Sequence, residues 1–205
     1  GCVSEADDVI EAAQDITNSP APAEESWYEI TTDTFEVPSG EERFLCYAFD
    51  LEEDLTVDTW AFESRPVVHH LIVAETFGDE PDGLSECDVL FRPTWFPIFV
   101  AGTGDTNVPA PEGAGYVLEQ GKRLLIQLHL LNASPEDVEE AVTLRLRRAE
   151  NPDLEPIGMM VFGSMALALP PREASDVVDT CEMSDEVEIF TVFPHMHYLG
   201  TSLVV

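Results

Sequence analysis

The residues best suited to chemistry in this sequence are its five histidines, which lie in three short apolar segments. They are His69, His70, His129, His195 and His197. Neutral imidazole is a common ligand of copper and zinc, and no cysteine lies beside any of these histidines. The set indicates metal binding by imidazoles alone, although a single strand histidine such as His129 is more often a hydrogen-bonded core residue.

The spacing of the histidines predicts which of them can share one ion. Side chains alternate between the two faces of a β-strand, so His195 and His197 lie on one face and can chelate a single metal. His69 and His70 are adjacent, so a regular strand would point them to opposite faces. A metal shared by both therefore requires a β-bulge or a strand end.

Beyond residue 26, short β-prone runs alternate with clusters of Pro, Gly and Asp, and helical periodicity is scarce. We therefore expect an all-β fold of antiparallel β-sandwich or jelly-roll type. The predicted strands cover residues 44–49, 67–73, 124–131, 141–146, 157–165 and 187–193. Alternation places Gln127 and His129 on the same side of their strand. It also turns Val142, Leu144 and Leu146 inward.

The charge balance limits the partners of this protein. Nine Lys and Arg residues against 41 Asp and Glu residues give a formal net charge of −32. Nucleic acids and anionic lipid surfaces both attract basic proteins, so direct binding to either is excluded. No apolar run is long enough to span a bilayer. The expected partners are small molecules and metal ions.

The chain divides into three predicted parts. Residues 1–26 are rich in Ala, Asp, Glu, Ser and Pro and predict a disordered acidic tether. A polar turn at 151–153 separates a first domain, 27–150, from the start of a second, 151–205. The final residues read as the middle of a strand, so we expect the second domain to continue beyond them.

The opening Gly1-Cys2 is similar to the end of a bacterial lipobox, in which the cysteine is acylated after removal of a signal peptide. An incidental cysteine is the alternative. Lipidation of Cys2 would hold a soluble domain at a membrane surface, so we expect a location in the cell envelope or outside the cell. In such a compartment Cys46 and Cys87 could pair and close a long loop, which leaves Cys181 without a partner.

The order of the motifs resembles the copper type II, ascorbate-dependent monooxygenase family, to which peptidylglycine α-hydroxylating monooxygenase and dopamine β-monooxygenase belong. The resemblance runs from about residue 44 to residue 205. It comprises a His-His pair in an apolar strand, a Gln-x-His motif and a His-x-His-x-Leu-Gly motif, with Cys181 upstream of the last. The family also places a disulfide where Cys46 and Cys87 lie.

The resemblance implies two β-sandwich domains, each holding one copper ion. The electron-transfer copper would be bound by His69, His70 and His129, and the copper that activates O2 by His195 and His197. Ascorbate or an equivalent one-electron donor would reduce both ions, and a small-molecule substrate would be hydroxylated at an activated C–H bond. Imidazole suits this chemistry because it tolerates both copper oxidation states, whereas an oxidant would attack a thiolate.

Two departures from the family affect the prediction. The methionine that completes the oxygen-activating site in the family does not follow His197 within the sequence. The arginine that holds a peptide carboxylate in the amidating members is replaced by the Phe193-Pro194 stretch. We therefore expect an apolar or aromatic substrate rather than a peptide C-terminus.

Three other functions fit parts of the pattern. A non-catalytic copper-binding module of the cell envelope would use the same histidines without turnover. A zinc hydrolase would use three histidines and a water, but it needs a general base, and no carboxylate lies within a histidine motif. A structural β-sandwich on a lipid tether would make the histidines incidental.

Overall fold

The computed structural model describes residues 26–87, 92–163, 168–183, 185–196 and 199–204. Their regular structure consists of β-strands, and no α-helix occurs among them. The strands are β1 (Trp27–Thr31), β2 (Phe35–Val37), β3 (Glu42–Asp50), β4 (Leu55–Phe62), β5 (Val68–Thr76), β6 (Gly83–Glu86), β7 (Trp95–Ala101), β8 (Thr106–Pro109), β9 (Ala114–Leu118), β10 (Arg123–Leu131), β11 (Val138–Glu140), β12 (Thr143–Arg148) and β13 (Glu155–Pro156). None of the described segments is a helix that could cross a membrane.

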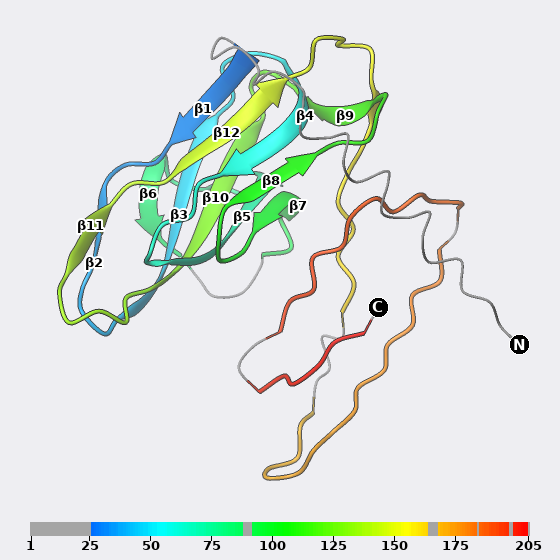
Figure 1. Ribbon diagram of the computed structural model, residues 1–205. Coiled ribbons are helices and arrows are strands. Elements are labelled where there is room, and N and C mark those ends of the chain that lie inside the picture. Colours follow the sequence, from blue (N-terminus) through cyan, green and yellow to red (C-terminus); the bar gives the residue numbers. More distant parts are fainter. Residues whose placement is uncertain (1–25, 88–91, 164–167, 184, 197–198, 205) are drawn as a thin grey trace, which may run out of the picture.

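Two sheets form the layers of a β-sandwich (Figure 1). One has the strand order β1-β12-β4-β9-β13, with β8 also paired to β4. The other has the order β6-β3-β10-β5-β7, and β11 pairs with β2 in a separate ribbon. Every pairing is antiparallel except that of β13 with β9. The all-β, antiparallel sandwich predicted from the sequence is confirmed.

The main core lies between the two sheets and is built by alternation along the strands. Val142, Leu144 and Leu146 are fully buried in it, as predicted. The even-numbered residues of β10, from Leu124 to Leu130, face the same interior. The odd-numbered residues of this strand are thereby turned to the outer face of the five-stranded sheet.

A second, smaller apolar cluster covers part of that outer face. It contains Cys46, Ala48, Ala74, Trp95 and Leu125. The predicted disulfide between Cys46 and Cys87 is confirmed and ties β3 to the connection that follows β6. Cys181 is exposed and free.

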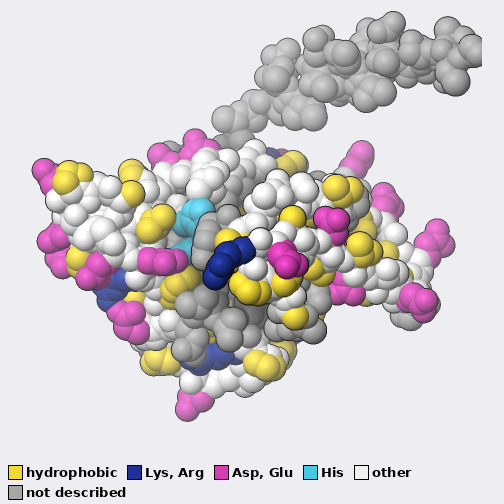
Figure 2. Space-filling model, turned by 90° about the horizontal axis from the view of Figure 1, so that it is seen from below, with side chains coloured by type: hydrophobic (Ala, Val, Ile, Leu, Met, Phe, Trp, Pro, Cys, Tyr) yellow, Lys and Arg dark blue, Asp and Glu magenta, His cyan; other side chains and the backbone are white. Residues whose placement is uncertain are grey.

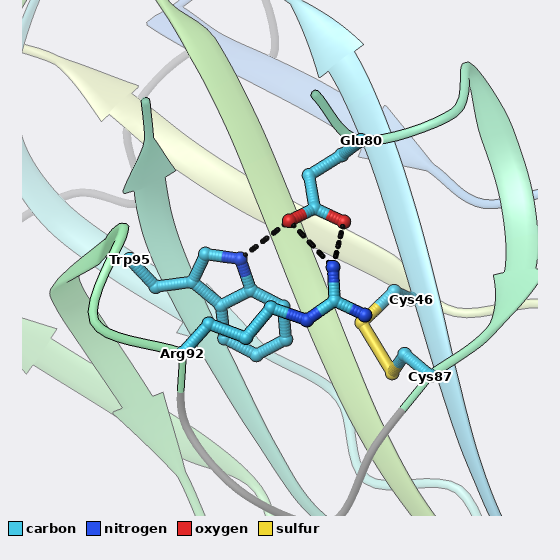
Figure 3. Close-up of a disulfide and its surroundings, with 5 residues drawn as sticks. All are labelled: Cys46, Glu80, Cys87, Arg92 and Trp95. Carbon is cyan, nitrogen blue, oxygen red and sulfur yellow. Dashed lines mark hydrogen bonds and ion pairs between the residues drawn. A yellow bond between two sulfur atoms is a disulfide. The ribbon is translucent and has the colours of Figure 1, made fainter. Parts of the chain in front are cut away.

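The buried carboxylate of Glu80 connects two side chains of the same region by hydrogen bonds (Figure 3). Glu80 is 7% exposed and accepts hydrogen bonds from the Trp95 indole at 2.8 Å and from the Arg92 guanidinium at 2.9 and 3.0 Å. The guanidinium carbon also lies 5.3 Å from the centre of the Trp95 ring, over its face. The disulfide and this carboxylate together hold the outer face of the sheet that carries the histidines.

The strands predicted at 157–165 and 187–193 are not formed by the described residues, which after β13 belong to no strand. Ile157 N–H donates to the Gly115 carbonyl at 2.9 Å, and beyond this residue the described segments run outside the two sheets (Figure 1). Their composition favours strands, but a strand also needs a partner edge. Large apolar side chains such as Phe162 and Ile189 remain exposed. The division into domains 27–150 and 151–205 stays a prediction, and 1–25 lie outside the described residues.

Substitution of Gly115 in β9 tests how closely β13 packs against the sandwich. A Cβ at this position would lie 2.6 Å from Leu154 Cδ1 and 3.0 Å from the Val57 carbonyl oxygen. We expect Gly115→Ala to lower the free energy of unfolding by about 1–3 kcal/mol, as overpacking of a tight site does. Chemical denaturation measures this loss. An unchanged denaturation midpoint for Gly115→Ala would show that β13 does not pack as described. Gly113→Ala is unsuitable as a control because Gly113 has a φ of 80°, a conformation that strains any residue with a side chain.

Candidate metal centre

Three of the five histidines converge on the outer face of the five-stranded sheet. His69 and His70 come from β5 and His129 comes from the neighbouring strand β10. One ring nitrogen from each lies within 4.8 Å of the other two. His129 is buried, His70 is half-buried and His69 is exposed, so the group runs from the sheet to the molecular surface. Figure 2 shows histidine side chains reaching the surface, with Asp and Glu side chains spread around the edge of that face.

A β-bulge brings the adjacent histidines together. In the register of β5 and β10, His129 pairs with His70 and the next residue, Leu130, pairs with Val68. His69 is therefore an extra residue in β5, so that two histidines lie opposite one. The sequence predicted that a shared ion would require a bulge or a strand end, and the bulge is present.

The ring of His129 is held from three sides. Phe44 lies directly opposite it on β3 and stacks on it, with ring centres 4.3 Å apart and planes 13° apart. Its Nε2 lies 2.6 Å from a carboxylate oxygen of Glu42. Its Nδ1 lies 3.4 Å from Nδ1 of His70. A carboxylate only accepts hydrogen bonds, so in a neutral His129 ring Nε2–H donates to Glu42 and the Nδ1 lone pair faces the other histidines.

The donor set fits a transition-metal ion. Metal–imidazole bonds are about 2.0–2.1 Å long, so two nitrogens on one ion lie at most about 4.2 Å apart. The Nδ1 atoms of His129 and His70, 3.4 Å apart, already meet this limit. Three neutral imidazoles without a thiolate suit copper or zinc. An orienting carboxylate on the far nitrogen of a ligand is typical of metal-bound histidine.

Gln127 lies on the same face of β10 as His129, as predicted. In the register it pairs with Cys46, a member of the outer cluster, and it is 3% exposed. Its neighbours Ile126 and Leu128 belong instead to the inner core. The Gln-x-His motif is thus an outward-facing pair on a strand whose opposite face is entirely apolar.

His195 lies beside this cluster rather than apart from it. Its ring centre is 5.1 Å from that of His70, and the two planes are 81° apart. The three clustered rings are themselves 4.7 to 5.5 Å apart. His197 and Cys2 lie outside the described residues. The separate copper site expected at His195 and His197 therefore stays a prediction.

Glu42 and Phe44 were not among the residues that the sequence singled out. Their positions follow from the pairing of β3 with β10, which a single sequence does not reveal. Nothing local in the sequence distinguishes Glu42 from its neighbour Glu41. An aromatic residue two positions before Cys46 was the one available signal, because it shares a strand face with that cysteine.

Comparison with known proteins adds no family assignment: no protein-family model matches the chain, and no curated protein matches it. The resemblance described above therefore depends on the sequence motifs alone.

Replacing His129 tests the cluster. We expect His129→Ala to weaken Cu(II) binding at least about tenfold, because the fixed central ligand is removed. Isothermal titration measures the affinity, and circular dichroism checks that the β-sheet signal is retained. Asn107→Ala serves as the control, because Asn107 is an exposed polar residue of β8 on the other sheet, and it should leave the affinity unchanged. Equal affinity in His129→Ala and the unaltered protein would contradict the assignment.

Proposed function

We propose that the protein is a copper-dependent monooxygenase and that His69, His70 and His129 bind the copper ion that transfers electrons. One observation carries the proposal: three imidazoles from two neighbouring strands present their nitrogens within 4.8 Å of one another. The bulge in β5 supports it further, because an irregularity that turns both members of a His-His pair to one ligand is a feature of functional sites.

The surroundings of the cluster favour copper over hydrolytic zinc. A zinc hydrolase needs a carboxylate base near the open side of the metal. The Glu42 carboxylate, which is hydrogen-bonded to His129, contacts the nitrogen that points away from the cluster. Copper also binds nitrogen ligands more tightly than zinc does in the general order of divalent metals.

In the proposed electron-transfer site, the histidines of the cluster have different roles. His129 is fixed by stacking and hydrogen bonding, so it provides a rigid ligand that resists reorganisation. His69 is exposed and gives a small reductant a short approach to the site. Copper, when bound, supplies a one-electron couple. The imidazoles stay neutral in both states, so no ligand has to gain or lose a proton.

The proposal places O2 activation at a second copper bound by His195 and His197. The substrate is a small apolar or aromatic molecule, because Phe193-Pro194 stands where the amidating enzymes have an arginine. The Phe193 ring lies against the sandwich, with its Cζ 3.3 Å from the Cβ that a side chain at Gly102 would have. The apolar stretch is thereby anchored beside the first domain.

A non-catalytic copper-binding module is the second candidate function. The position of His195 favours it, because its ring lies next to His70. Oxygen consumption by the copper-loaded full-length protein with ascorbate and a panel of aromatic substrates separates the two candidates. The monooxygenase proposal predicts hydroxylated product that requires both His129 and His195, with one O2 used per product. Copper binding with no product from any substrate would favour the module.

A location outside the cytoplasm is part of the proposal. A disulfide persists in oxidising compartments, and the Cys46–Cys87 bond supports such a setting. Lipid attachment at Cys2 would then keep the copper domain near the membrane without inserting it. The acidic composition suits this arrangement, because like charges keep the domain away from anionic headgroups.

Ionic strength should change the rate at which ascorbate reduces the bound copper. The net charge is −32, and ascorbate is an anion at neutral pH. We expect the rate at which ascorbate bleaches the Cu(II) signal to rise as salt screens this repulsion, over the range in which the Debye length falls from about 30 Å to about 8 Å. Stopped-flow absorbance measures the rate. Hexaammineruthenium(II), a cationic donor, should show the opposite trend, and parallel trends for both donors would exclude steering by the acidic surface.

A further inference from the structure

An exposed carboxylate makes a close contact with the most buried histidine of the cluster. Glu42 Oε1 lies 2.6 Å from His129 Nε2, although the Glu42 side chain is 58% exposed and that of His129 is 9% exposed. The strand pairing accounts for the contact. Phe44 lies opposite His129, and Glu42 is two residues before Phe44 on the same strand face. Glu42 is thus the diagonal neighbour of His129 across the β3–β10 pair.

This contact determines which nitrogen of His129 is available. A neutral imidazole carries one N–H, and the carboxylate can only accept it. With hydrogen on Nε2, the lone pair is on Nδ1, the atom that lies 3.4 Å from His70 Nδ1. The opposite tautomer would direct an N–H toward His70 and leave two acceptors facing each other at Glu42.

We propose that Glu42 is a positioning residue of the metal centre: it fixes His129 as the Nε2–H tautomer and makes Nδ1 a stronger donor. The part concerning copper rests on the proposed function. A carboxylate that accepts a hydrogen bond from a ligating imidazole increases its basicity, which stabilises Cu(II) more than Cu(I). Glu42 therefore lowers the reduction potential of the site.

Most surface carboxylates have little effect on a neighbouring group, because water screens them and their side chains are free to rotate. Glu42 differs because its partner is buried and cannot move away. Phe44 stacks on one face of the His129 ring, and the paired backbones of β3 and β10 fix the separation of the two residues. The hydrogen bond consequently has one mobile partner rather than two.

The tautomer can be tested without metal. Two-dimensional 15N NMR of the imidazole rings in the metal-free protein distinguishes a protonated from an unprotonated ring nitrogen. We expect His129 to carry its hydrogen on Nε2 in the unaltered protein, and Glu42→Ala to give a mixture of tautomers. The matched control is Glu41→Ala, which removes the same charge from the adjacent residue. An Nδ1–H tautomer in the unaltered protein would overturn the proposal even if no copper binds, so this failure is distinct from that of the proposed function.

The copper-loaded protein tests the effect on the metal. We expect Glu42→Ala to weaken Cu(II) binding by about 10–100-fold and Cu(I) binding by less. Each tenfold difference between the two losses raises the reduction potential by about 59 mV. Glu42→Gln keeps a hydrogen-bond acceptor without the charge, so its potential should lie between those of Glu42→Ala and the unaltered protein. An unchanged potential in Glu42→Ala, whether or not affinity falls, would overturn the proposal, because a merely structural role leaves the potential unaltered.

Discussion

The arrangement of the candidate metal centre depends on a conflict between core packing and strand register in β5. Val68 and Leu71 are both buried in the inner core, although they are three residues apart and a regular strand would turn them to opposite faces. One extra residue between them resolves the conflict, and that residue is His69. The packing that requires the bulge is thus also what places His69 and His70 together on the outer face. A metal site whose geometry is imposed by the hydrophobic core is preorganised before any ion binds.

The two faces of the five-stranded sheet have different roles: one packs in the core and the other carries the candidate metal centre. Its inner face is apolar and packs against the other sheet, whereas its outer face carries the histidines, Glu42 and the Cys46–Cys87 disulfide. Cys46 pairs with Gln127, two residues before His129, so the covalent bond and the metal centre share the strands β3 and β10. Rigidity near the histidines therefore comes from three sources: the core beneath, the disulfide beside them and the ring of Phe44. This rigidity fits the electron transfer that we propose for the site, because a rigid set of ligands changes little in shape between two oxidation states.

Features that local residues determine could be predicted from the sequence, whereas contacts that depend on the pairing of distant strands could not. The strand at 124–131 was predicted because a short β-prone run lies between clusters of turn-forming residues. The need for a bulge at the adjacent His69 and His70 followed from the alternation of side chains along a strand. Glu42 was missed because its partner is 87 residues away in the sequence, and only the register of β3 against β10 brings the two together. At 187–193 the composition favoured a strand, yet these residues belong to no strand, because composition does not determine whether a partner strand is available.

A crystal structure of the copper-loaded protein, with the metal located by anomalous scattering at the copper edge, shows whether the three histidines bind one ion. We expect a copper peak at bonding distance, about 2.0–2.1 Å, from one nitrogen each of His69, His70 and His129, with Nδ1 as the ligating atom of His129. A chain that binds copper elsewhere, or that shows no anomalous peak between these three rings at saturating copper, would contradict this assignment.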